Sequence, residues 1–477
     1  TNLGAVDAGQ VGQFANLQMG SHLCAYGLPE LLLLWGLTLN LYLRLGFLPN
    51  ELKSEFLNMT TTVFDSVTLP GDLRLKNRLV KAAMEENLAN EDRSPSLRML
   101  NLYQRWSQGG VGLIITGNVM VDGQHMTGPG GLVLSSESQI PQFAQWAQAA
   151  KSGGSQVWMQ INHPGRQAPV KLNHYSLGPS AVALELGNFS MLFAPVRAMS
   201  EAEIHRVIGQ FAETARLAHE AGFDGVEIHG AHGYLVSQFL SPLVNKRDDQ
   251  WGGSLENRAR LLVEIVNAIR AAVPKDFALA VKINSADFQR GGFAPEDALK
   301  VVKMLELLGV SLVELSGGSY EAPAMQGKSR DERTLSREAY FLQFAQEIAE
   351  QTNLPVMTTG GIRRLPVANE VVQQGVTLVG IATALALVPD LPNRWRQQDD
   401  PEPALAPLNW QNKTLASLAS QAQVRQMIRK NANRQGYAKQ APYWLALAKD
   451  QWLDRLNTSA YKRWSNRVRK PGGVKEA

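Results

Sequence analysis

Short apolar runs alternate with longer stretches of helical periodicity along most of the chain. From Asn77 onward, each run rich in β-branched residues is followed by a stretch whose apolar positions recur every three or four residues. The predicted strands cover residues 78–84, 111–116, 156–161, 225–229, 278–283, 312–316, 355–359 and 378–382. The predicted helices lie near residues 95–108, 137–152, 200–221, 254–273, 295–308, 337–351 and 365–374.

This order of elements predicts an α/β fold. Near-continuous apolar strands are typical of parallel strands covered on both faces. Eight strands in this order, separated by helices, fit a closed (β/α)8 TIM barrel, whose active site lies at the carboxyl ends of its strands. A doubly wound open sheet is the alternative, but it would have a glycine-rich turn after its first strand, where this chain reads EENLANED. We therefore predict the barrel. The long connections 162–200 and 316–336 would overhang its site.

The chain divides into three regions. Residues 59–390 contain the predicted barrel. Residues 391–477 lose the strand–helix rhythm and are predicted to form a basic helical C-terminal extension. Its amphipathic segments carry Trp and Leu at helical spacing, and we expect these side chains to pack on the barrel. A partner-binding surface is the alternative for the same pattern.

The first region, residues 1–58, is an N-terminal leader whose place in the native fold is left open. Its apolar segment Leu28–Leu48 is long enough to span a bilayer, but it contains Glu30 and Arg44. One interpretation is a membrane anchor. We favour the other, in which Met59 is the native start and the upstream stretch is a translated leader.

Charge is distributed unevenly. The chain has a net charge of +4, but residues 401–477 carry 14 Lys and Arg against 4 Asp and Glu. A basic tail of this kind can contact nucleic acid or an anionic membrane. We favour an ordinary solvated helical surface, and so expect no nucleic-acid partner and no membrane contact. Homo-oligomerisation is compatible with the sequence.

Cys24 is the only cysteine in the chain. This excludes a disulfide framework, a cysteine-based zinc cluster and a cysteine-ligated iron–sulfur cluster built within the chain. It also favours a reducing compartment, and we expect a cytoplasmic protein.

Two histidines and a tyrosine follow one another at the fourth predicted strand. His229 ends the strand, and His232 and Tyr234 lie in the loop after it. Two imidazoles so placed can donate hydrogen bonds to one substrate oxygen, and a nearby phenol can act as a general acid. The alternatives are structural side chains or metal ligands. A metal would need further ligands, and His163 is the only other histidine near a strand end, so we expect no metal site.

Other strand ends carry groups suited to a cofactor. Gly360 and Gly361 follow strand seven, where these barrels often bind phosphate through closely approaching backbone amides. A tight turn alone would also explain them, but the barrel context favours a phosphate-bearing cofactor. Gln160 and Lys282 end strands three and five. An amide suits a pyrimidine-like ring, and a cation suits an anionic one.

Six stretches together resemble the old yellow enzyme family of FMN-dependent NAD(P)H oxidoreductases. They are LKNRLVKAAM (75–84), GGVGLIITG (109–117), QINHPGRQ (160–167), EIHGAHGYLVSQFLSPLVNKRDDQWGGSLENR (227–258), LSGGSYE (315–321) and TTGGIR (358–363). The resemblance covers roughly residues 60–390, and the long fourth-strand motif is its most specific part.

The resemblance implies a set of FMN-binding residues. Residues at the end of strand one would line the flavin, an amide of strand three would bond its pyrimidine edge, and a cation of strand five would favour its reduced, anionic form. Glycines after strands six and seven would surround the phosphate. In that order, the residues are Ala82, Ala83, Met84, Gln160, Lys282, Gly318, Gly360 and Gly361.

The resemblance also implies catalytic roles. His229 and His232 match the pair that binds a substrate carbonyl or a nicotinamide amide, and Tyr234 matches the proton donor. The implied cycle passes a hydride from NADH or NADPH to FMN and then to the β-carbon of a small enone-like alkene, while Tyr234 protonates the α-carbon. The alternative is a catalytically weak flavin-fold protein that binds or regulates through its basic tail.

The chain departs from the family pattern in two places. Where relatives commonly have Gly-Arg after strand eight, this chain has Ala382 and Thr383. Losing that arginine would remove about 1.5–3 kcal/mol of phosphate binding, and Arg363 and Arg364 are candidates to compensate. Glu85 stands where relatives place Cys or Thr beside the flavin. An ionised carboxylate there would lower the flavin potential, unless it points into solvent.

Overall fold

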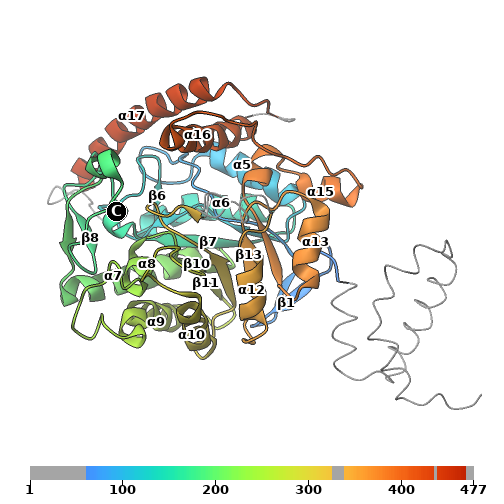
Figure 1. The fold of residues 1–477 in the computed structure, drawn as a ribbon. Coiled ribbons are helices and arrows are strands. Elements are labelled where there is room, and N and C mark those ends of the chain that lie inside the picture. Colours follow the sequence, from blue (N-terminus) through green and yellow to red (C-terminus); the bar gives the residue numbers. More distant parts are fainter. Residues whose placement is uncertain (1–60, 325–337, 434–437, 469–477) are drawn as a thin grey trace, which may run out of the picture. The chain divides into compact units, whose positions relative to one another are not determined.

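Eight parallel strands close into a barrel in the computed structural model, which describes residues 61–324, 338–433 and 438–468. Each strand pairs with the next along the chain, and β10 closes the ring by pairing with both β7 and β11 (Figure 1). The strands are β3 (Leu79–Lys81), β4 (Leu113–Ile115), β7 (Gln156–Asn162), β10 (Gly225–Gly230), β11 (Ala278–Asn284), β12 (Leu312–Ser316), β13 (Val356–Thr359) and β14 (Leu378–Ile381). The predicted TIM barrel is confirmed.

Helices follow the strands and cover the outside of the barrel. They are α5 (Leu97–Gln108), α6 (Ile140–Lys151), α7 (Glu201–Glu220), α9 (Leu255–Ala272), α10 (Pro295–Glu306), α12 (Leu342–Ala349), α13 (Leu365–Gln373) and α14 (Thr383–Leu387). Their starts follow local capping rules. Ser200 and Glu203 form a reciprocal capping box at α7, and Ser254 caps α9 at the end of the long fourth-strand motif.

Short elements that the hydrophobic pattern did not predict lie in the connections. They are β1 (Val67–Leu69), β2 (Leu73–Leu75), β5 (Val119–Met120), β6 (Leu132–Val133), β8 (Ser176–Gly178), β9 (Val196–Ala198) and α8 (Leu235–Leu240). The β1–β2 hairpin has a structural role, because Leu69 and Leu75 join the apolar cluster formed by residues such as Leu113 and Leu312, which begin their strands. This end of the barrel is therefore filled, and the site lies at the carboxyl ends.

The chain continues into helices α15 (Leu391–Arg396), α16 (Lys413–Asn431) and α17 (Tyr443–Val468). Helices α16 and α17 pack against each other (Figure 1). Helix α17 also contacts the loop after β3 through the Arg463–Glu91 ion pair. Tyr461 donates its hydroxyl to the Gly123 carbonyl at 3.0 Å. The expected packing of the Trp positions holds only in part, because Trp444 and Trp452 are 64% and 57% exposed.

Among the described helices, none is long and apolar enough to cross a membrane. The apolar segment Leu28–Leu48 and the predicted start at Met59 lie outside the described residues. The leader and the cellular location therefore stay predictions.

Candidate active site

His229, His232 and Tyr234 converge at the carboxyl end of β10. The ring of His229 lies 5.0 Å from that of His232 and 4.7 Å from that of Tyr234, measured between centroids. His232 has a φ of 61°, an uncommon conformation for a residue with a side chain. Its amide donates to the Asn284 side-chain oxygen at 3.0 Å, which holds this turn against β11.

Both histidines are neutral at ordinary pH. Burial lowers the pKa of each well below its usual value, and Lys282 adds to the effect. The Ala231 amide donates to Nδ1 of His229 at 3.3 Å, so the ring proton of His229 belongs on Nε2. Nε2 of His232 lies 2.7 Å from the Ser316 hydroxyl, which leaves Nδ1 for a ligand. Each ring therefore keeps one nitrogen that can donate an N–H to a ligand.

Tyr234 is 6% exposed, and its hydroxyl lies 3.0 Å from that of Tyr320. Burial, followed by the neighbouring Tyr320, raises the pKa of Tyr234 well above its usual value. The pKa of Tyr320 rises to about 12, mainly through burial. Both phenols therefore hold their protons at neutral pH. Tyr320 was not among the predicted site residues, although it belongs to the LSGGSYE stretch of the resemblance.

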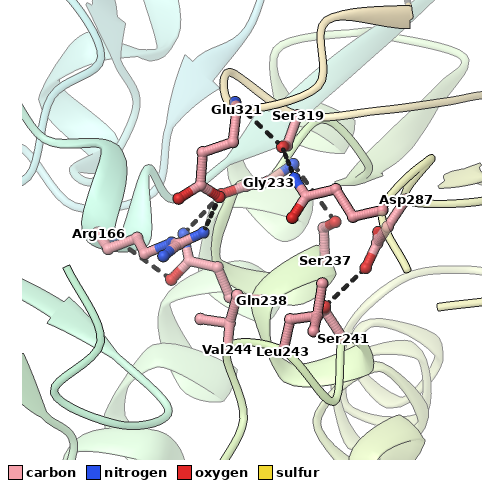
Figure 2. A pocket seen from close by; sticks show the side chains of 11 residues that line it. Arg166, Gly233, Ser237, Gln238, Ser241, Leu243, Val244, Asp287, Ser319 and Glu321 are labelled. Carbon is pink, nitrogen blue, oxygen red and sulfur yellow. Dashed lines mark hydrogen bonds and ion pairs between the residues drawn. The ribbon is translucent and has the colours of Figure 1, made fainter. Parts of the chain in front are cut away.

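Polar side chains lock together the loops that present these residues (Figure 2). Gln238 donates to the Gly233 carbonyl at 2.7 Å and accepts from the Arg166 amide at 3.1 Å, which joins the β10 and β7 loops. The Arg166 guanidinium pairs with Glu321 at 2.5 Å, which adds the β12 loop. The position of Tyr234 relative to Tyr320 thus depends on a buried network rather than on loop backbone alone.

A polar layer fills the barrel next to the histidines. Gln160 donates its amide to Glu227 at 2.7 Å, and Lys282 pairs with Glu314 at 2.7 Å. Thr359 also donates to Glu314, at 3.1 Å. The predicted cofactor residues Gln160 and Lys282 are therefore brought into one layer, but each is already tied to a carboxyl group.

Glu227 and Glu314 are functional candidates that sequence reasoning missed. Burial, and then the adjacent Glu314, raises the pKa of Glu227 well above its usual value. A Glu227 that keeps its proton leaves Lys282 and Glu314 as the ion pair of this layer. The sequence feature that could have indicated them is a glutamate in the middle of a predicted strand, in GVEIH (225–229) and in LVELS (312–316).

The end of β3 opens toward this layer. The predicted strand 78–84 stops at Lys81, because the chain leaves the sheet after the Ala82 amide donates to Ile381 at 3.0 Å. Ala83 and Met84 are half-buried at the barrel mouth. The Glu85 carboxylate is not free in solvent, because it accepts a hydrogen bond from the Thr127 hydroxyl at 2.9 Å. Burial raises the pKa of Glu85, which weakens the charge expected from it.

The glycine loop after β13 adopts left-handed backbone conformations. Gly360 and Gly361 have φ values of 131° and 74°. A Cβ on Gly361 would lie 2.6 Å from Cζ of Tyr340, so ring packing also requires glycine here. These conformations are compatible with both interpretations of Gly360 and Gly361, a tight turn and a phosphate-binding loop. Gly318 has a φ of 85°, and its carbonyl accepts from Asn284.

Arg363 and Arg364 lie beside this loop, and the Nε atom of each donates to Glu338 at 2.8 Å. Thr383, at the start of α14, is exposed. The cations nearest in sequence to the glycine loop are therefore already paired with one carboxylate. Their other guanidinium nitrogens are the donors that could reach a phosphate.

The residues present fit FMN. The amide of Gln160 and the ammonium of Lys282 match a ring with hydrogen-bonding edges and a developing negative charge. Gly360 and Gly361 have positive φ values and carry no side chain, which suits backbone amides that bind a phosphate. These assignments of individual residues stay predictions.

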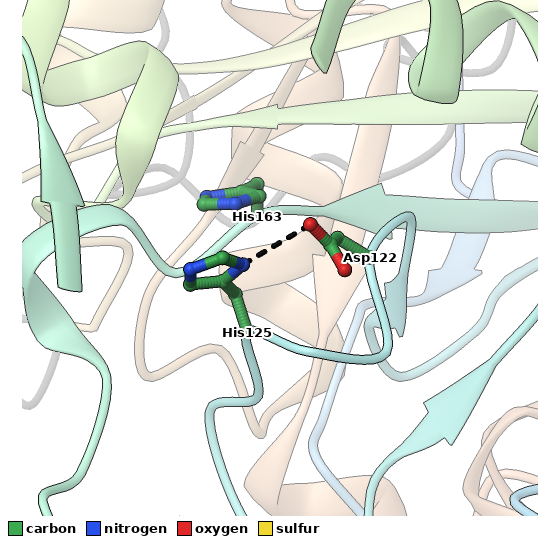
Figure 3. A group of neighbouring side chains, drawn as sticks. All are labelled: Asp122, His125 and His163. Atoms are coloured by element: carbon green, nitrogen blue, oxygen red, sulfur yellow. Dashed lines mark hydrogen bonds and ion pairs between the residues drawn. The ribbon is translucent and has the colours of Figure 1, made fainter. Parts of the chain in front are cut away.

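His163 lies with Asp122 and His125 rather than with His229 and His232 (Figure 3). Asp122 accepts from His125 and from Arg206, each at 3.1 Å. His163 accepts the Gly165 amide at Nδ1, and burial lowers its pKa to about 3, so a neutral ring carries its proton on Nε2. A protonated Nε2 and an arginine-paired carboxylate disfavour a bound cation. We interpret the group as the Asp122–Arg206 ion pair, hydrogen-bonded to His125 and lying beside the neutral imidazole of His163.

Comparison with known proteins identifies similar chains. A family model described as the NADH:flavin oxidoreductase / NADH oxidase family matches residues 63–401. The chain is 37% identical over 351 residues to the NADH-dependent flavin oxidoreductase iliE of Hypocrea jecorina (strain QM6a), covering 68% of this chain and 86% of that protein. It is 36% identical over 332 residues to the NADH oxidase of Thermoanaerobacter brockii, covering 69% of this chain and 50% of that protein.

Solved structures show the same similarity. The old yellow enzyme homologue from Zymomonas mobilis superposes with a TM-score of 0.62 at 26% sequence identity, covering 73% of this chain and 95% of that one. The helices after residue 401 lie beyond the part that the family model matches.

Proposed function

Since this chain belongs to the NADH:flavin oxidoreductase / NADH oxidase family, we propose that its substrates are small alkenes conjugated to a carbonyl group. The protein is an FMN-dependent NAD(P)H oxidoreductase, and the substrate class is the part that we propose. One observation carries the proposal: two neutral imidazoles lie next to a protonated phenol at the open end of the barrel.

The imidazoles suit a carbonyl oxygen. His229 at Nε2 and His232 at Nδ1 can both donate hydrogen bonds to it, which stabilises negative charge as it develops there. Electron density is then withdrawn along the conjugated double bond, and the β-carbon becomes electrophilic. Bound FMN supplies the hydride that it has received from NADH or NADPH.

The phenol suits the α-carbon. Tyr234 keeps its proton until a strong base is generated beside it, and the α-carbon of a reduced enone is such a base. A tyrosinate left in a buried site is costly, so Tyr234 must regain a proton quickly. The hydroxyl of Tyr320, 3.0 Å away, is hydrogen-bonded to Tyr234 and can pass a proton to it.

The cofactor assignments are part of the same proposal. Gln160 and Lys282 would contact the ring, Ala82, Ala83 and Met84 would line it, and the loops of Gly318, Gly360 and Gly361 would surround the phosphate. Support comes from the shared polar layer and from the backbone conformations of the glycines. The rival interpretation, a catalytically weak binding protein, depends on Ala382 and Thr383. The complete catalytic group argues against it.

Anaerobic reoxidation of the flavin tests the substrate class. NADH-reduced protein is mixed with 2-cyclohexenone, with cyclohexanone as the matched control and with oxygen in a separate experiment. We expect the enone to reoxidise the flavin with a rate that saturates, and to be converted to cyclohexanone. Reoxidation by oxygen alone, with no effect of the enone, would reject the proposed substrate class.

A further inference from the structure

A cavity of about 230 Å³ lies between the loop after β3 and the C-terminal helices. Its lining includes Ser96 and Arg98 at the start of α5, Arg429 on α16, and Asn457 on α17. Leu88 and Leu453 form an apolar part of the wall. The cavity is separate from the group formed by His229, His232 and Tyr234, and no role in the proposed reaction is assigned to it.

The first indication of a ligand is a buried hydrogen-bond donor without a partner. Arg429 is only 7% exposed, and one of its terminal nitrogens donates to Asp450 at 2.7 Å. The other, Nη1, is buried and has no hydrogen-bond partner among the described residues. Buried guanidinium donors are normally paired, so this one calls for an acceptor.

A second cation lies close to the first. Arg98 donates from Nε to the Asn433 side chain at 3.1 Å, and it lines the same cavity. Burial, and then the charge of Arg429, lowers the pKa of Arg98. An anion between Arg98 and Arg429 would stabilise the positive charge of both side chains.

The backbone adds to this field. The 12-residue helix α5 begins at the cavity, is capped by Ser96 and has no acidic residue in its first turn. The N-terminus of a helix favours negative charge. The residues that line the cavity include no Asp or Glu. The nearest carboxylate partner, Asp450, is shared by Arg425 and Arg429 and so cannot neutralise the site alone.

We infer that this cavity binds a small organic oxyanion, a carboxylate or a phosphate ester. Its charged group contacts Arg98 and Arg429, and its apolar part lies against Leu88 and Leu453. The volume exceeds what a single inorganic ion fills, which favours an organic ligand. The bound anion joins the barrel to the C-terminal helices. It also contacts the loop after β3, whose residues Asn87 to Asn90 line the cavity.

Thermal unfolding of the FMN-loaded protein tests this site, because FMN already fills its own phosphate site. Sodium phosphate and phenyl phosphate are compared with sodium chloride at matched ionic strength. We expect a saturable rise in Tm, on the order of 2 °C or more, with both phosphates, and tighter binding of phenyl phosphate. An identical shift in chloride, or equal affinity for the two phosphates, would overturn the assignment.

Three variants locate the effect. Arg98→Gln should weaken the apparent phosphate affinity about tenfold or more, since it removes a charge-assisted bond. Asn457→Asp keeps the shape but adds a carboxylate, so it should raise Tm without phosphate and abolish the phosphate shift. Arg455→Gln removes an exposed arginine from the same helix and should bind like the parent. Parent-like shifts in both Arg98→Gln and Asn457→Asp would place the anion elsewhere.

Discussion

The hydroxyl oxygens of Tyr234 and Tyr320 lie 3.0 Å apart, although the two residues come from loops after different strands of the barrel. Tyr320 also packs near Phe193, with 6.0 Å between ring centroids. The pair places a second phenolic proton beside the first, in a buried environment where both pKa values are raised. Tyr320 is thereby placed to position the proton donor, and its partly exposed side chain can relay to Tyr234 a replacement proton that comes from solvent.

Replacement of Tyr320 by Phe should slow the enone step and spare flavin reduction. Loss of one neutral hydrogen bond of about 0.5–1.5 kcal/mol predicts a decrease of roughly twofold to tenfold in the rate of enone reoxidation. Stopped-flow absorbance of the two half-reactions measures this. Tyr443→Phe, which removes a phenol on α17 bonded to Ala406, is the matched control. Equal slowing in both variants would contradict the role of Tyr320.

Stability should fall in mild acid because several histidines are buried in neutral form. Burial lowers the pKa of His163 to about 3 and those of His229 and His232 well below their usual value of about 6.5. Below that pH the unfolded chain binds protons that the native chain does not, so the free energy of unfolding decreases as pH falls. With a native pKa of about 3, His163 contributes about 2 kcal/mol of this loss between roughly pH 6.5 and 5, and His229 and His232 act in the same direction.

Denaturant unfolding at several pH values checks the acid effect. His163→Gln should reduce the loss by about one histidine's share, whereas His205→Gln, at a side chain that is 61% exposed, should leave it unchanged. A free energy of unfolding that stays constant from about pH 8 to 5 would show that the buried rings are not neutral as inferred.

Removal of the Glu314 charge should raise the flavin reduction potential. Glu314 pairs with Lys282 at 2.7 Å, so Glu314→Gln leaves that cation unbalanced and favours the anionic reduced flavin. A change of about 1.4 kcal/mol in the stability of the reduced form corresponds to a shift on the order of 30 mV. Glu227→Gln is the matched control, because a Glu227 that is already protonated should leave the potential nearly unchanged. Potentiometric titration measures both, and equal shifts would reject the assigned protonation.

An arginine at position 383 should tighten FMN binding. Thr383 stands where the family commonly has the phosphate-binding arginine, and one charge-assisted bond predicts about tenfold to a hundredfold higher affinity in Thr383→Arg. Flavin fluorescence quenching measures the Kd, with Thr383→Gln as the uncharged control. An unchanged Kd in Thr383→Arg would mean that another cation, such as Arg363 or Arg364, already holds the phosphate.

The fold was predictable because parallel barrel strands are recognisable as short apolar runs. All eight predicted strands are present, and the largest discrepancy, at residues 78–84, arises because Ala82 is the last residue tied to the sheet. The β1–β2 hairpin and the short strands in the connections were not predicted, since segments of two or three residues carry no period. The exposure of Trp444 and Trp452 was not predicted either, because helical periodicity does not say which stripe faces the barrel.

The candidate site was predictable where residues lie close in sequence. His229, His232 and Tyr234 share one motif, and the structure brings their rings together. Pairings across strands could not be predicted in the same way. The Tyr234–Tyr320 contact and the Lys282–Glu314 ion pair join residues 86 and 32 positions apart. Such pairs depend on how the barrel closes and on loop conformations, which cannot be predicted from a single sequence.

Rates of the two half-reactions in Tyr234→Phe test the proton-donor assignment most directly. Stopped-flow absorbance would follow anaerobic flavin reduction by NADH and then reoxidation by 2-cyclohexenone, in the parent and in the variant. Reoxidation should slow by about 10²–10⁴-fold, the usual contribution of a general acid, while reduction by NADH stays nearly unchanged. An unchanged rate of reoxidation, or an equal loss in both half-reactions, would contradict the assignment of Tyr234 as the proton donor.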